Sequence, residues 1–430
     1  PGYCHLYLVD QSSYVFDLSS IDPATTGVDP DAAKTVDSWR TVVVGGMRFG
    51  GACKNEGDAC TQDMDGDGDI DSDDCVNTPV ADLGYSSYFA LDITNTAEAP
   101  KLLWEFNDPD LGYSTTGPAI VRIAATSVDG GGTEYFDNTK NGYWYIVVGS
   151  GPTGPIDKDN TQFLGRSDQN FKLFVFDAYE GPNSGLTVID TGVPDAFAGS
   201  MFNIAFDTLA SHPDPVVKDY SDDAMYIGYT KKCTSDRAKS GVQGECNAGY
   251  WNDGGIGRLV TFADPDPAKW EYSTLIDGIG PVTAATAKAI AADAGADDII
   301  LVLAATGRYS YVRPLANGTS MPDDYQAVRH IIGTIDPCYY SPKFPYGDAP
   351  ANGGAGCSGV SVDLNEFNDV TDVADVIDGL KDAGKAGWFI EMDPSGTYTE
   401  ENMSGVEETF EVAAERAITD LVATSDGVLF

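Results

Sequence analysis

Short apolar runs alternate with turn residues along almost the whole chain, so strands are the main elements that the pattern predicts. The runs are rich in β-branched and aromatic residues. They are flanked by turn residues, namely Gly, Pro, Asp and Asn. We therefore expect an all-β fold. The predicted strands span residues 39–47, 87–93, 101–106, 143–151, 171–181, 186–190, 225–230, 256–264, 270–277, 299–309 and 330–336.

The predicted strands fall into loosely repeating units. Each unit contains an apolar strand that ends in glycine, a second strand that ends in aspartate and, often, a third strand. Radial repetition of short antiparallel sheets is the way in which a β-propeller hides its strand edges. We therefore expect residues 1–430 to form a single modified β-propeller domain with long loop insertions. An array of β-sandwiches is the alternative.

Two segments have the composition of helices rather than of strands. Alanine dominates residues 283–295, and residues 372–384 end at Gly384, which suits the position just after a helix. A few short helices are therefore expected among the strands.

One acidic segment, DMDGDGDIDSDD at residues 63–74, matches the twelve-residue calcium loop. Gly68 stands where that loop turns sharply, and Ile70 is the apolar residue expected to anchor the loop to the body of the fold. Carboxylates this dense repel one another unless a cation lies between them. The loop belongs to an insertion at 48–86. The predicted Ca²⁺ ligands are Asp63, Asp65, Asp67, Asp69 through its carbonyl oxygen, Asp71 and Asp74.

Eight cysteines indicate an oxidising compartment and disulfide bonds. Cys233 and Cys246 flank a polar, glycine-containing loop, and Cys338 and Cys357 bracket a loop rich in proline and glycine. Each pair is placed like the two ends of a stapled loop. The full connectivity stays open at this point. We also expect at least one bridge to anchor the calcium loop, which is surrounded by Cys53, Cys60 and Cys75.

The charge of the chain excludes two classes of partner. Its 67 acidic and 25 basic residues give a net charge of -42. Nucleic acids and anionic membrane surfaces would be repelled by such a protein. No run approaches the roughly 18 apolar residues of a membrane span, so we expect no membrane insertion. The chain begins without methionine and ends in DGVLF, which suggests a fragment of a larger protein.

Motifs of catalysis are missing from the sequence. It contains only three histidines, no G-x-S-x-G nucleophile elbow and no H-E-x-x-H zinc motif. Residues 379–386 fit G-x-x-x-x-G-K, but Ala386 replaces the hydroxyl residue that would hold magnesium. We therefore expect a protein that is not an enzyme.

Several of these segments together resemble a known family. WRTVVVGGM, YFALDITN, LLWEFNDPDLGYSTTGPAIVRI, IILVLAATGRY and GWFIEMD occur in the order found in the C-terminal propeller domain of PilY proteins. These proteins are associated with the tips of bacterial type IV pili. The resemblance implies export through the periplasm to the cell surface or pilus tip. It also implies a role in pilus assembly, retraction control and adhesion, with minor pilins or other tip components and host or abiotic surfaces as partners.

The chain departs from the family in the position of its calcium loop. Family members carry the loop beside a later repeat, which corresponds to residues 216–229 here. That segment keeps Asp219, Asp222 and Asp223 but lacks the glycine of the turn. The intact loop instead lies in the insertion between VVVGGM and YFALDI. The calcium-gated role of the family therefore does not transfer to it by position.

Two other functions are compatible with parts of the sequence. A quinoprotein dehydrogenase of the pyrroloquinoline quinone type also contains propeller repeats of the form ALD…W, as in ALDITNTAEAPKLLW, but here only Trp104 and, more loosely, Trp270 fit. A structural module of an extracellular filament complex, with no adhesive role, would share every feature of a pilus protein.

Calcium is expected to stabilise the folded chain by ordering the insertion at 48–86. The alternative is a switch, in which calcium exchanges and alters the binding of partners. A site that binds only the folded state adds about 4 kcal/mol to the free energy of unfolding at a thousandfold excess of calcium over its Kd. Titration with calcium should raise the melting temperature of the wild type and leave that of Asp63→Ala/Asp67→Ala unchanged. An unchanged melting temperature in the wild type would exclude a structural role for the ion.

Overall fold

The structure, a computed structural model, is all-β in the part of the chain that it describes. That part comprises residues 9–48, 53–54, 70, 76–77, 86–157, 162–207, 219–234, 246–292, 298–308, 327–338, 357–371, 386–401, 405–412, 414–424 and 427–429. Within these ranges no α-helix occurs, and the helical elements are short 3₁₀ turns. These are η1 (Val36–Ser38), η2 (Pro267–Lys269) and η3 (Leu364–Glu366).

Most strands belong to four mainly antiparallel sheets that follow one another along the chain. Sheet 1 contains, in spatial order, β1 (Tyr14–Ser19), β2 (Trp39–Gly46), β5 (Tyr88–Asp92) and β6 (Lys101–Phe106). Sheet 2 contains β7 (Ala119–Ile123), β10 (Tyr143–Gly149), β13 (Lys172–Asp177) and β14 (Gly181–Asp190). In both sheets each strand pairs with the next one in sequence among the members of that sheet.

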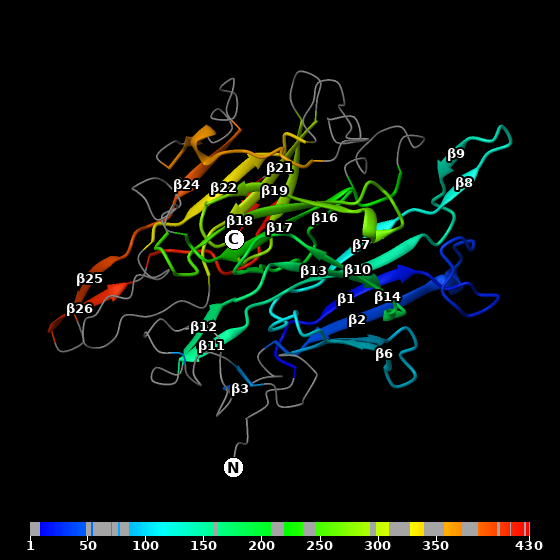
Figure 1. The fold of residues 1–430 in the computed structure, drawn as a ribbon, viewed down its shortest axis with the longest axis horizontal. Coiled ribbons are helices and arrows are strands. Elements are labelled where there is room, and N and C mark those ends of the chain that lie inside the picture. The colour runs from blue at the N-terminus through cyan, green and yellow to red at the C-terminus, as the bar shows by residue number, and fades with distance from the viewer. Residues whose placement is uncertain are drawn as a thin grey trace, which may run out of the picture.

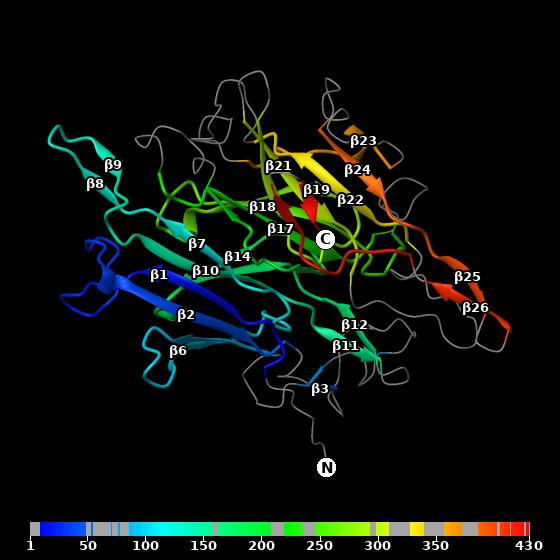
Figure 2. The same cartoon turned by 180° about the vertical axis from the view of Figure 1, so that it is seen from behind.

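Sheets 3 and 4 repeat this plan with additions. Sheet 3 contains β15 (Ala196–Ala198), β17 (Ala224–Lys231), β18 (Asp253–Val260) and β19 (Glu271–Asp277), and β16 (Ala205–Phe206) also pairs with β17. Sheet 4 contains β20 (Ala287–Ala292), β21 (Asp298–Ala305), β22 (His330–Ile335), β24 (Gly387–Glu391) and β23 (Phe367–Asp369). The pair β23–β24 is parallel. Figures 1 and 2 show the sheets in chain order, from the blue strands of sheet 1 to the yellow and orange strands of sheet 4.

Short two-stranded ribbons extend from these sheets. Figures 1 and 2 show two of them, β8–β9 and β25–β26, projecting at opposite ends of the molecule. The ribbons are formed by β3 (Cys53–Lys54) with β4 (Val76–Asn77), β8 (Thr126–Val128) with β9 (Glu134–Phe136), β11 (Gly154–Asp157) with β12 (Gln162–Arg166), β25 (Gly396–Glu401) with β26 (Glu407–Val412), and β27 (Val422–Thr424) with β28 (Gly427–Leu429).

The strand predictions are confirmed, with one systematic omission. Every predicted strand coincides with a strand of sheets 1 to 4, within a few residues at its ends. The first strand of each sheet, however, was not predicted: β1, β7, β15 and β20. The prediction also lacked β16 of sheet 3 and β23 and β24 of sheet 4.

The helix predicted over 283–295 is wrong, because residues 287–292 form β20. Alanine favours a helix when a segment is considered alone. Here β20 pairs along its whole length with β21, whose valine, leucine and isoleucine residues suit a strand. Tertiary pairing therefore overrides the local preference. The helix predicted over 372–384 lies outside the described residues.

Aromatic side chains hold neighbouring sheets together. Trp104 on β6 packs edge-on against Phe176 of sheet 2, with ring centroids 5.1 Å apart, and its indole N–H donates to the carbonyl of Ala178 at 3.1 Å. Gly181 has a φ of +79°, and a Cβ there would lie 2.4 Å from the Trp104 ring. Trp270 packs edge-on against Tyr145 of sheet 2 at 5.4 Å. The same apolar core thus runs through sheets 1, 2 and 3, and a second core joins sheet 3 to sheet 4.

Main chains of neighbouring sheets approach closely where several sheets meet. The amide of Ala198 donates to the main-chain carbonyl of Ser150 at 2.8 Å. The amide of Ser200 donates to the main-chain carbonyl of Thr283, also at 2.8 Å. Glycine makes this proximity possible, because a Cβ at Gly149 would lie 2.4 Å from the Cβ of Ala198. The glycine that ends many of the predicted strands is therefore a packing requirement.

Substitution of Gly149 by alanine should destabilise the protein. The added methyl group has no room between β10 and β15, and overpacking of this kind costs about 1–3 kcal/mol. A lower melting temperature is expected. Gly130→Ala is the matched control, since a Cβ there meets nothing within 4 Å. Equal melting temperatures of the two variants would contradict the close approach of these sheets.

Candidate functional site

The predicted calcium ligands lie outside the described residues, but the base of their insertion is visible. Strands β3 and β4 pair in antiparallel register, Cys53 opposite Asn77 and Lys54 opposite Val76. This ladder brings together the two ends of the segment that carries Asp63 to Asp74. A short closed base reduces the entropy that an ion must offset when it orders the loop.

The structure describes one residue of the calcium loop. Ile70, which was expected to anchor the loop to the body of the fold, is 57% exposed. The attachment that the structure does show is the main-chain ladder of β3 and β4.

The second acidic segment is held by main-chain amides. Asp222 accepts a hydrogen bond from the amide of Arg122 at 2.8 Å, and Asp219 accepts one from the amide of Ser221 at 3.0 Å. Burial raises the pKa of Asp222 to about 6. The carboxylate of Asp222 therefore joins the segment before β17 to β7 of sheet 2, whereas the bond of Asp219 stays within its own segment. Among the described residues no group of three or more His, Cys, Asp or Glu side chains is arranged to hold a metal ion.

His330 is buried in the interior of sheet 4. Its side chain packs edge-on against Phe389, with ring centroids 5.4 Å apart, and Nε2 lies 3.9 Å from Oε1 of Glu391. Burial, and then the nearby charge of Arg329, lower its pKa to about 4. The imidazole is therefore neutral at pH 7. The residue as a whole is only 1% exposed. This environment suits a packed side chain. His5 and His212 lie outside the described residues.

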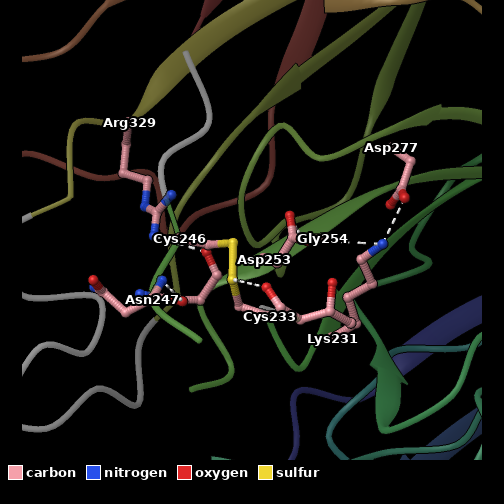
Figure 3. Close-up of a disulfide and its surroundings, with 10 residues drawn as sticks. Lys231, Cys233, Cys246, Asn247, Asp253, Gly254, Asp277 and Arg329 are labelled. Carbon is pink, nitrogen blue, oxygen red and sulfur yellow. Dashed lines mark hydrogen bonds and ion pairs between the residues drawn. A yellow bond between two sulfur atoms is a disulfide. The ribbon is translucent and has the colours of Figure 1, made fainter. Parts of the chain in front are cut away.

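Two of the predicted disulfides are confirmed. Cys233 is bonded to Cys246 and Cys338 to Cys357, with Cα atoms 5.9 and 5.8 Å apart. Figure 3 shows the first of them beside Lys231, which forms ion pairs with Asp277 at 2.5 Å and with the buried Asp253 at 3.7 Å. The bridge thus closes a loop at the end of sheet 3. Cys4, Cys60 and Cys75 lie outside the described residues, and of Cys53 only the strand is described.

A buried ion pair supports the second disulfide. Arg258 on β18 pairs with Asp336, which follows β22, and both side chains are fully buried. Asp336 also accepts from the hydroxyl of Tyr226 and from the amide of Cys338, each at 2.8 Å. Arg258 donates to the carbonyl of Cys357 at 3.0 Å. Sheets 3 and 4 and the disulfide are therefore joined by one hydrogen-bonded network.

A cavity of about 290 Å³ lies where the four sheets meet. Its walls come from the segments that precede β1, β7 and β20, from those that follow β2, β10 and β21, and from β12 and β15. Arg308, only 1% exposed, forms part of the wall. Its Nη1 donates to the carbonyls of Leu164 at 3.0 Å and Gly165 at 3.1 Å. The cavity has polar and apolar walls in similar measure.

Sequence reasoning missed this cavity because its walls come from many short, separated segments. No single motif marks it. The wall includes Gly117, Gly165 and Gly199, but none of these glycines ends a predicted strand, so the strand pattern did not mark them.

Comparison with known proteins gives no relative: no family model, no curated protein and no solved structure matches the chain. Across the described ranges no helix is long and apolar enough to cross a bilayer. Disulfides persist in oxidising compartments and are rare in the cytosol, so the two bridges indicate an exported protein.

His330 is expected to make the stability of the protein depend on acid pH. Its folded pKa of about 4 lies below the unfolded value, so the unfolded chain takes up the proton first as the pH falls. The stabilising contribution of the neutral ring is full above pH 6.5 and is lost as the pH falls to about 4, by about 3 kcal/mol. Urea unfolding of wild type and His330→Gln at pH 7 and pH 4 measures the difference. A pH dependence that is equal in the two proteins would contradict the burial of a neutral histidine.

Proposed function

We propose that the chain is a calcium-binding, non-enzymatic module of a PilY-like protein at the surface of a bacterial cell, associated with the tip of type IV pili. It acts there in pilus assembly, retraction control and adhesion. The observation that carries the proposal is the position of the family-like motifs in the fold. WRTVVVGGM, YFALDITN and LLWEF supply β2, β5 and β6, and GPAIVRI leads into β7. The most similar stretch thus coincides with sheet 1 and its connection to sheet 2.

Contacts between the first strands support a modified β-propeller. Tyr14 on β1 donates to the Oδ1 atom of Asn203 at 2.5 Å, and Lys288 on β20 donates to the carbonyl of Asn203 at 3.3 Å. Sheets 1 and 4, which are far apart in sequence, therefore both reach the segment that follows β15. A common centre for the first strands is the arrangement that radial sheets require.

The net charge and the disulfides of the chain support a location outside the cytosol. The net charge of -42 disfavours binding to nucleic acids and anionic membranes. Disulfides hold the loops of sheets 3 and 4. Extracellular calcium would keep a loop such as that at 63–74 occupied and would offset the repulsion among its carboxylates.

One observation favours the quinoprotein alternative. Trp104 and Trp270 both pack between neighbouring sheets, as the tryptophans of that class do in the repeats. Addition of pyrroloquinoline quinone distinguishes the two functions. We expect no bound chromophore. A stoichiometric one would favour the dehydrogenase.

Binding to pilus components tests the proposed function. The immobilised chain should retain minor pilins in the presence of calcium, and Asp63→Ala/Asp67→Ala should retain less if the loop orders the binding surface. Glu98→Ala/Glu105→Ala is the matched control, since it also removes two acidic groups and both residues are exposed. Retention of no pilus component by the wild type would contradict the proposal and favour a structural role in another filament.

A further inference from the structure

The cavity at the meeting point of the four sheets has the size of a site for one small ring. Pockets that bind drug-sized ligands measure about 300–1,000 Å³. The cavity, at about 290 Å³, lies just below that range. Its wall combines a rigid part with an open part, because Gly117, Gly199 and Arg308 are buried while Asp10, Ser12 and Asp420 are exposed. A ligand would therefore enter past the exposed residues.

The charges of the wall are balanced, unlike those of the chain. Two acidic residues, Asp10 and Asp420, face the cavity together with two basic residues, Arg48 and Arg308. The whole chain has 67 acidic and 25 basic residues. An anionic ligand would meet the two carboxylates, and a cationic ligand would meet the two guanidinium groups. The balanced wall favours a neutral ligand.

The remaining polar groups offer both donors and acceptors. The hydroxyl residues Ser12, Thr115, Ser200 and Thr283 are among the residues that line the cavity, as is Gln11. Some are held in place: Ser200 donates to Asp420 at 3.3 Å, and Thr283 donates to the carbonyl of Gly307 at 2.9 Å. Hydroxyl groups both donate and accept, so a ligand with several hydroxyl groups can pair with carboxylate, guanidinium and hydroxyl alike.

An aromatic surface completes the wall. Phe202 is partly exposed and packs against Tyr14, with ring centroids 5.3 Å apart. It also covers Gly117, where a Cβ would lie 2.3 Å from the ring. Phe197, which packs with Trp251, adds a second aromatic side chain. Aromatic rings bury the C–H face of a ligand while leaving its polar edge free to form hydrogen bonds.

We propose that this cavity binds a neutral monosaccharide, either free or as the terminal unit of a glycan. A sugar ring has the two properties that the wall requires, an apolar C–H face for Phe202 and a rim of hydroxyl groups for the polar residues. The site is independent of the calcium loop and of the assignment to a pilus, since it depends only on residues that line the cavity.

Two arms of one experiment test the proposal and separate the two sources of the sugar. Isothermal titration of the purified full chain with common neutral monosaccharides tests free sugars. A glycan array that carries the same sugars, together with sialylated and sulfated glycans, tests terminal units. We expect a neutral sugar to bind in at least one arm. Phe202→Leu keeps the apolar volume but removes the aromatic face, and should weaken binding about three- to tenfold.

Controls distinguish the site from a general loss of structure. Ser200→Ala removes one hydroxyl group from the wall without a large change in packing, and should also weaken binding. Phe262→Leu is the matched control, because Phe262 is 38% exposed and lies away from the cavity. The proposal is overturned if no neutral sugar binds, if only anionic glycans bind, or if Phe202→Leu and Ser200→Ala bind the sugar as tightly as the wild type.

Discussion

The fold depends on direct hydrogen bonds between the main chains of different sheets at the point where those sheets meet. The short strand β15 and the residues after it are central to this contact. Their amides donate to carbonyls at the end of β10, within β17 and before β20. Such bonds require main chains to come closer than side chains on both would allow. Glycine at the ends of the strands meets that requirement, which explains why so many of the predicted strands end in glycine.

The same constraint determines where polar groups can be buried. Between sheets 3 and 4, the buried pair of Arg258 and Asp336 is also hydrogen-bonded to the hydroxyl of Tyr226, the amide of Cys338 and the carbonyl of Cys357. A buried ion pair is costly unless further hydrogen bonds offset the loss of its hydration. Removal of either partner would leave a charge without compensation, so this pair fixes how the two sheets are placed. At the centre itself, convergence leaves a cavity, since four twisted sheets cannot fill the space with main chain alone.

Much of the fold could be predicted from the sequence, for identifiable reasons. The second and third strands of each sheet are rich in valine, isoleucine and aromatic residues, and end in glycine or aspartate, so their pattern is local. The first strands are weaker signals: β15 has three residues and β20 is mostly alanine, and both become strands only through pairing with a neighbour. The two disulfides could be predicted because each pair of cysteines brackets one loop, a polar loop in the first pair and a loop rich in proline and glycine in the second. The cavity could not, because it is assembled from segments that share no motif. The calcium loop, by contrast, is predicted by a strong local motif, but its ligands lie outside the described residues.

Hydrogen exchange at the amides of Ala198, Gly199 and Ser200 measures whether the main-chain bonds between the sheets form. These residues belong to a three-residue strand and the turn after it, where exchange is usually fast. Protection similar to that of the core strands β10 and β17 is expected, because each amide donates to a carbonyl of another strand or sheet at 2.7–2.8 Å. Exchange at the rate of an exposed loop would show that the sheets do not meet through their main chains, and would contradict the account.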